Sequence, residues 1–136
     1  MKILIKNPDG TVGIMHPILN CGLTIEEIAK KDSGGVPYEI VDDSIIPSDR
    51  TFRNAWKHDL TIDITMAQEI TKERLRRERA PLLEKLDIDV MKNITDPVKL
   101  ATIEEQKQIL RDLPQQVDNL TTVEELKAIK AEQPAI

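Results

Sequence analysis

The sequence predicts an α+β protein, in which a small β-unit with one short helix precedes a long antiparallel helical hairpin and a short C-terminal helix. Two observations carry this prediction. Short extended segments bounded by turn residues fill residues 2–41, whereas apolar residues from position 65 onward recur at helical spacing. Aromatic residues are only 2 % of the 136 residues, so Ile, Leu, Val and Met must form the core. We expect an N-terminal unit over 1–58 and a helical unit over 64–131.

Three strands are predicted in the N-terminal unit. Residues 2–6 and 11–15 are β-rich and flank Asn7-Pro8-Asp9-Gly10, a strong turn sequence, so they predict a β-hairpin. An isolated hairpin is marginally stable in water, and a third strand or a helix must cover it. Residues 36–41 alternate like a strand and supply the third one, with Pro37 favouring a sheet edge or a strand start.

Two further features complete the N-terminal unit. Thr24 and Glu27 form a capping-box sequence, which predicts a short helix from Ile25 to about Lys31. Phe52 and Trp56 lie four residues apart, so one face of a short helix would carry both rings. We expect this aromatic pair to be buried against the small sheet and to tie the sheet to the helices.

The helical unit is predicted to begin at Thr65, where Gln68 completes a second capping-box sequence. Pro81 interrupts this pattern, and either the helix kinks there or a second helix begins there. The next helix is capped by Thr95 or Asp96, has Pro97 in its first turn, and runs to about residue 112. Residues 114–119 read as a polar loop, a last short helix opens at 122–125, and residues 132–136 read as frayed.

The apolar stripes of the two long helices are the candidate interaction surface. A narrow hairpin buries little area alone, so we predict that its stripes pack against copies of the chain or a larger partner. Arginines beside the stripes are candidates as well, because Arg is enriched in interfaces. The residues proposed for this protein interface are Leu75, Arg76, Arg79, Leu82, Leu83, Leu86, Leu100, Ile103, Leu110 and Arg111.

Composition argues against several classes of protein. The net charge of −5 and the glutamates that interrupt the basic stretch 72–79 argue against a nucleic-acid binder. No apolar run approaches the roughly 20 residues that span a bilayer, so we expect no membrane partner. The N-terminal apolar stretch is too short for a signal peptide, which leads us to expect synthesis in the cytoplasm.

No residue pattern predicts catalysis. His16, Cys21 and His58 match no zinc or iron spacing, and the acidic pairs Asp42-Asp43 and Asp87-x-Asp89 lack the ligands of a calcium loop. We therefore predict no catalytic, cofactor or metal site and no small-molecule substrate. An enzyme remains the alternative if the two histidines and the cysteine converge on one metal.

Residues 45–127 resemble a family of small proteins of tailed bacteriophages and prophages. The C-terminal part is similar to tail assembly chaperones and tail-fibre-associated proteins, in which a basic helix ending in Leu-Asp precedes a helix ending in Leu-Arg-Asp. Those chaperones commonly carry Trp after the Leu-Asp step, where this chain has Ile88. The segments that carry the resemblance are 46–56, Arg76-x-x-Arg79-Ala80-Pro81-Leu82-Leu83-x-x-Leu86-Asp87, Ile103-x-x-Gln106-Lys107-x-x-Leu110-Arg111-Asp112-Leu113-Pro114 and 121–126.

The resemblance implies a structural, non-enzymatic role. It predicts a virion protein of the tail, fibre or head-attachment region, made in the bacterial cytoplasm, which oligomerises or contacts larger virion proteins. It supplies no catalytic or cofactor-binding residue. The alternative is a soluble tail assembly chaperone that is absent from the mature virion.

Overall fold

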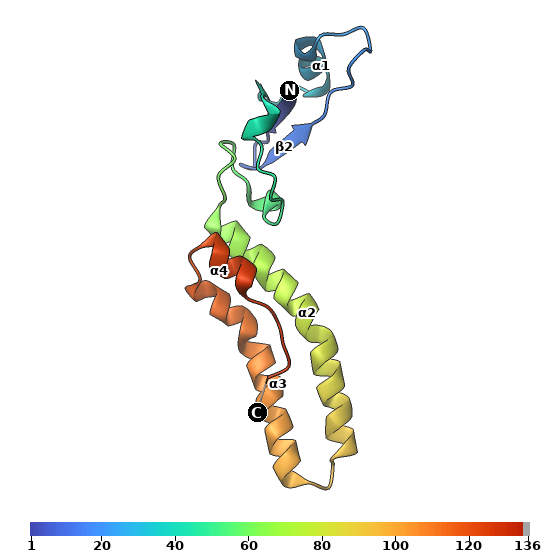
Figure 1. Cartoon of the computed structure of the whole chain (residues 1–136), viewed down its shortest axis with the longest axis vertical. Helices are drawn as coiled ribbons and strands as arrows, with labels where there is room; N and C mark the ends of the chain where they lie inside the picture. The colour runs from blue at the N-terminus through green and yellow to red at the C-terminus, as the bar shows by residue number, and fades with distance from the viewer. Residues whose placement is uncertain (135–136) are drawn as a thin grey trace. The chain divides into compact units, whose positions relative to one another are not determined.

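A computed structural model describes residues 1–134 and confirms the α+β class (Figure 1). The chain forms two compact units, Met1–Asp63 and the part from Ile64 onward. Each unit has a hydrophobic core of its own.

The N-terminal unit is built on a three-stranded antiparallel sheet. Its strands are β1 (Lys2–Lys6), β2 (Val12–Met15) and β3 (Tyr38–Val41), in the order β2-β1-β3. The turn between β1 and β2 closes with Asn7 N–H donating to Thr11 O at 3.0 Å, and Gly10 takes a φ of 89° that favours glycine. Both the predicted hairpin and the predicted third strand are confirmed.

Helix α1 (Ile25–Asp32) packs on one face of this sheet. The capping box is formed, because Glu27 N–H donates to Thr24 Oγ1 at 3.2 Å and Thr24 N–H donates to Glu27 Oε2 at 2.8 Å. Ile28 and Ala29 of the helix are buried against Ile3 of β1. The apolar face that the sequence gives to this short helix therefore closes the core of the unit.

The aromatic pair is buried, but not on a helical face. Phe52 and Trp56 flank a single 3₁₀ turn, η2 (Arg53–Ala55), and each exposes 3 % or less of its surface. An α-helix is not formed here, because Asp49 and Asp59 each fold the chain into a tight turn. Asp59 Oδ1 accepts from Thr61 Oγ1 at 2.6 Å and from Thr61 N–H at 3.0 Å, and both bonds lower the pKa of Asp59. A second short 3₁₀ turn, η1 (Asp43–Ile45), follows β3.

The helical unit is an αα-hairpin of α2 (Ile64–Lys92) and α3 (Pro97–Gln116), which lie side by side in Figure 1. Helix α2 runs through Pro81, so Pro81 does not begin a separate helix. Asp96 caps α3, accepting from Lys99 N–H at 3.1 Å, and Pro97 occupies the first helical position as predicted.

Two predictions for the C-terminal region are wrong. The expected loop 114–119 is instead the end of α3, through Pro114, followed by the 3₁₀ turn η3 (Val117–Asn119). An extended segment over residues 129–134 runs along the hairpin. Within the end expected to be frayed, 132–136, Lys85 donates to Gln133 Oε1 at 3.1 Å and Gln106 donates to Pro134 O at 3.0 Å; residues 135 and 136 lie outside the described part. Helix α4 (Val123–Ala128) lies between them, capped by Thr122 as the sequence suggests.

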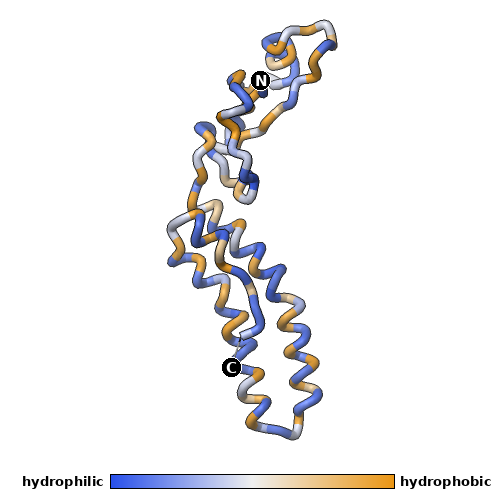
Figure 2. Tube along the Cα trace, viewed as in Figure 1, coloured by the Kyte–Doolittle hydropathy of each residue, from blue (hydrophilic) through white to orange (hydrophobic). Residues whose placement is uncertain are grey.

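The core of the helical unit joins all three helices. Apolar and polar stretches alternate along α2 and α3 (Figure 2), and the apolar ones meet between the helices. Within residues 1–134 no helix combines the length and apolarity that crossing a membrane requires. The side chains that are most deeply buried in this unit are those of Ala67, Thr71, Leu75, Leu86, Leu110, Val117 and Leu126.

Candidate protein-interaction surface

Four of the residues proposed for the interface are buried inside the helical unit. Leu75, Leu86, Ile103 and Leu110 expose between 0 and 6 % of their surface. Leu82 and Leu83 are half-buried against the same core. Since a buried side chain cannot also contact a partner, these residues stabilise the hairpin in this structure rather than offering it to another chain. The premise that the stripes exceed what one chain can bury is therefore wrong for these four residues.

Arg79, another proposed interface residue, joins the two helices. Its Nη1 donates to the carbonyl oxygens of Leu110, at 3.1 Å, and Arg111, at 2.7 Å. In an α-helix the carbonyl of Leu110 would accept from the N–H of residue 114, but Pro114 has none. Arg79 thus supplies the missing donor, which explains how α3 continues through Pro114.

The remaining two arginines lie at the surface. Arg76 is paired with Glu73 at 3.1 Å and Arg111 with Glu104 at 2.9 Å, both within a single helix. Leu100 is half-buried near the start of α3. Exposed pairs of this kind contribute little to stability, so Arg76 and Arg111 are available to a partner and Arg79 is not.

Because Arg79 replaces the donor that Pro114 lacks, the effects of substituting these two residues on the free energy of unfolding should be strongly coupled. Arg79→Ala leaves the two carbonyls without their charged donor and is expected to lower the free energy of unfolding by about 1.5–3 kcal/mol. In a Pro114→Ala background residue 114 donates to Leu110 itself, so the same substitution should cost clearly less. Urea unfolding of the four proteins gives the coupling energy.

Arg76→Ala is the matched control for this cycle, because Arg76 makes only an exposed pair, and its cost should stay within about 0.5 kcal/mol. Equal costs of Arg79→Ala in the two backgrounds would refute the role given to Arg79.

The C-terminal segment is held by side chains of α2. Arg74 Nη2 donates to the carbonyls of Leu126, at 3.0 Å, and Ile129, at 2.6 Å. Glu78 Oε2 accepts from Ala131 N–H at 3.1 Å, while its other oxygen pairs with Arg74 at 2.8 Å. Burial alone would raise the pKa of Glu78, but the bonds from Ala131 and Arg74 outweigh it and lower that pKa. Glu78 is therefore charged at neutral pH while it holds the segment.

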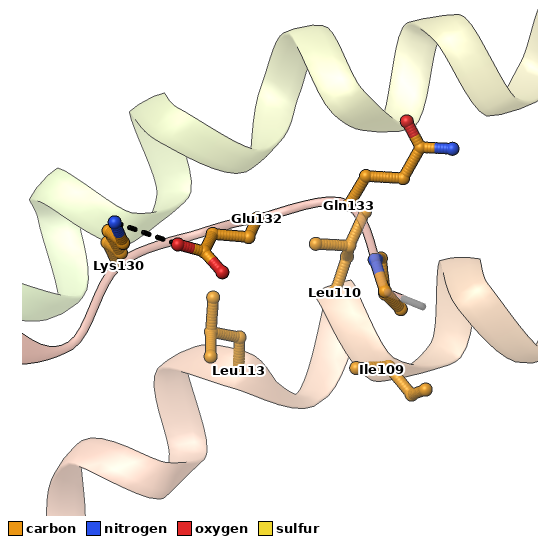
Figure 3. Close-up of a pocket in the computed structure, with 7 residues that line it drawn as sticks. Ile109, Leu110, Leu113, Lys130, Glu132 and Gln133 are labelled. Atoms are coloured by element: carbon orange, nitrogen blue, oxygen red, sulfur yellow. Dashed lines mark ion pairs between the residues drawn. The ribbon is translucent and has the colours of Figure 1, made fainter. Parts of the chain in front are cut away.

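A pocket of about 290 Å³ lies between this segment and α3 (Figure 3). Ile109, Leu110 and Leu113 of α3 form its apolar side. The other side is formed by Lys130, Glu132, Gln133 and Pro134. Its one carboxylate, Glu132, is paired with Lys130 at 2.8 Å, and the hydrogen bond raises the pKa of Lys130. An exposed lysine–carboxylate pair beside three aliphatic side chains offers no nucleophile with an activating base.

Several exposed apolar side chains of the described helical unit gather at the end of the hairpin. Four large apolar side chains lie there, 52–77 % exposed, around the turn between α2 and α3. We call this group the apolar tip; it consists of Ile88, Met91, Ile94 and Val98. A shallow pocket of about 280 Å³ adjoins it, lined by Asp89, Asn93, Val98, Lys99, Thr102 and Ile103. The sequence analysis missed these residues, although apolar residues beside a helix–helix turn and off the buried stripe signal such a patch.

The candidate metal ligands do not converge. His16 and Cys21 line one pocket of about 350 Å³, whereas His58 Nε2 lies 2.9 Å from Asn7 O. Residues 1–134 contain no group of three His, Cys, Asp or Glu side chains arranged to hold a metal ion.

Members of both acidic pairs have structural partners. Asp42 caps η1 by accepting from Ser44 N–H at 2.9 Å, and Asp43 pairs with the N-terminal amine at 3.1 Å. Asp87 pairs with Lys107 across the hairpin at 2.7 Å. These contacts account for three of the four aspartates without a bound cation.

Comparison with known proteins adds no relative: no family model, no curated protein and no solved structure matches the chain.

Proposed function

We propose that this protein is a non-enzymatic structural or adaptor component of a bacteriophage particle, in the tail, fibre or head-attachment region. The resemblance of residues 45–127 to small phage and prophage proteins supports the phage assignment. The apolar tip of the hairpin is the observation that supports a role in binding other proteins. The second candidate function is that of a soluble tail assembly chaperone, which the similarity of the C-terminal part favours.

The apolar tip has the character of a docking surface. Its side chains gain about 25 cal/mol for each Å² of apolar surface that a partner removes from water. Exposed apolar side chains that gather in one region of a soluble protein often mark an interaction site. Charged residues surround it, among them Lys92, Asp96 and Lys99, with Asp96 and Lys99 4.0 Å apart. An apolar centre with a polar rim is the usual arrangement of a protein–protein contact.

The rest of the hairpin is suited to presenting this tip rigidly. Arg79 joins α2 to the end of α3, the ion pair Lys72–Asp118 (2.7 Å) joins α2 to η3, and residues 129–134 are bound along the same helices. Binding through a rigid surface loses less conformational entropy than binding through a mobile one. The hairpin thus serves as an arm whose end makes the contact.

Mass spectrometry of purified particles tests the proposal. The particles are those of the phage, or the induced prophage, that encodes this chain. The chain should be present in a fixed ratio to the major structural proteins, after density-gradient purification and a high-salt wash. Its absence from particles, together with abundance in the producing cells, would contradict the structural role and favour the chaperone.

A further inference from the structure

We propose that strand β2 pairs with β2 of a second copy, joining two three-stranded sheets into one six-stranded antiparallel sheet. This dimer concerns the N-terminal unit and does not depend on the proposed function. It rests on the hydrogen-bonding pattern of the sheet, on the charges along its two edges and on the register that symmetry allows.

The free hydrogen-bonding groups of β2 can be assigned from the ladder. Asn7 N–H donates to Thr11 O, so this opposed pair is hydrogen-bonded, and in an antiparallel ladder such pairs alternate. Gly13 and Met15 therefore bond toward β1. The backbone N–H and C=O groups of Val12 and Ile14 point away from β1, to the open edge of the sheet.

The opposite edge, formed by β3, is open as well but carries charge. Lys6 N–H donates to Pro37 O at 2.8 Å, so by the same alternation Tyr38 and Ile40 present the outward groups of β3. Pairing of β3 with its own copy would gather Glu39, Asp42 and Asp43 of both chains at one seam. Charged side chains on an edge strand oppose such pairing, whereas β2 carries no charged residue.

Twofold symmetry is compatible with a register of the β2 pair that is centred on Ile14 of both copies, and we propose this register. A twofold axis perpendicular to the sheet keeps each side chain on its own face, and a centre at Ile14 places its outward N–H and C=O opposite those of the copy. Val12 then lies opposite His16 of the copy, and Gly13 lies opposite Met15. The ladder gains about six hydrogen bonds by the alternation rule, and Pro17, which lacks an N–H, falls at a position that bonds inward.

The edge is accessible and has apolar neighbours. Helix α1 packs mainly toward β3, and its residues Ile28 and Lys31 line a pocket that also contains Met15 and His16. Ile18 and Leu19, 76 % and 74 % exposed, follow β2 after His16 and Pro17 and are further apolar side chains open to a partner. A pair of four-residue strands buries less area than a standard-size interface, so we expect a weak dimer that forms only at high protein concentration.

Amide hydrogen exchange across a dilution series of the full chain tests the proposal. Sedimentation equilibrium should show a monomer–dimer equilibrium. The amides of Val12, Ile14 and His16 should exchange several-fold more slowly at the highest concentration than at the lowest. Those of Tyr38 and Ile40, the matched outward amides of β3, should not change. A chain that stays monomeric, or a dimer that leaves the three β2 amides unprotected, overturns the proposal.

A pair of variants provides the second measurement. Ile14→Pro removes the central outward N–H, which takes no part in the monomer's ladder, and should abolish the dimer. Ile40→Pro makes the same change on the β3 edge and should leave the dimer intact if the variant remains folded. Folding is checked by the protection of the Gly13 and Met15 amides. Dimerisation of a folded Ile14→Pro protein would also overturn the proposal.

Discussion

Replacing Leu110 with alanine is expected to lower the free energy of unfolding of the helical unit by about 2–5 kcal/mol. Leu110 exposes 1 % of its surface and packs with Leu86 and Ile103 between α2 and α3. Truncation to alanine removes buried methyl groups and leaves a cavity that neighbouring helices fill only in part. Urea unfolding followed by helical circular dichroism measures the loss, because most helical residues belong to this unit.

Ile109 is the matched control for this prediction. It is the preceding residue of the same helix but is 42 % exposed, so Ile109→Ala should cost about 1 kcal/mol or less. Similar losses for the two variants would mean that the stripe does not lie between the helices. The prediction that the stripe residues contact a partner would then regain support.

Replacing Pro81 with alanine is expected to raise the free energy of unfolding by about 2 kcal/mol. Proline inside a helix is about 3 kcal/mol less favourable than alanine, because the carbonyl of residue 77 loses its donor and the ring crowds the preceding turn. The more flexible unfolded chain of the variant offsets about 0.4–1 kcal/mol of this gain. Pro81 is exposed within a continuous helix, so its replacement sacrifices no buried contact.

Glu84→Ala is a suitable comparison for Pro81→Ala. Glu84 is exposed in the same helix, and its replacement should change stability by no more than about 0.5 kcal/mol. If Pro81→Ala gives no gain over this control, α2 accommodates the proline without strain. The penalty assigned to Pro81 would then be wrong for this helix.

The elements predicted correctly are those with a local signal. The capping box of Thr24 and Glu27 and the first-turn Pro97 each specify a helix start within four residues, and both are formed. The Pro-Asp-Gly turn and the alternating strands likewise specify the hairpin and the third strand. Such signals need no knowledge of the rest of the chain, which is why sequence reasoning recovered the fold class.

The errors arose where distant residues decide the local structure. Pro114 reads as a helix stop, but Arg79 of another helix donates to the carbonyl that the proline leaves free. Residues 132–134 read as frayed, but Lys85 and Gln106 of the two long helices donate hydrogen bonds to Gln133 and Pro134. Phe52 and Trp56 have helical spacing, yet tight turns on both sides leave only one 3₁₀ turn between them.

The candidate surface was predictable only in part. Periodicity marks Leu75, Leu86 and Leu110 as apolar and facing one way, but it cannot distinguish a partner chain from a neighbouring helix of the same chain. The structure shows that all three are buried within the chain and that Leu86 and Leu110 pack together between α2 and α3. Packing of these stripes leaves the residues around the hairpin turn uncovered, and that is where the apolar tip lies.

The most direct test of the account is the incorporation of a tip variant into particles, measured by quantitative mass spectrometry. Met91→Lys with Val98→Glu removes two of the most exposed apolar side chains of the tip, and each new charge suits the adjacent helix dipole. The variant should therefore fold and melt like the parent. As a control, Gln115→Lys with Thr121→Glu introduces the same two charges at exposed positions elsewhere. We predict that the control enters particles at the parental copy number and that the tip variant does not; a folded tip variant present at the parental copy number would contradict the account.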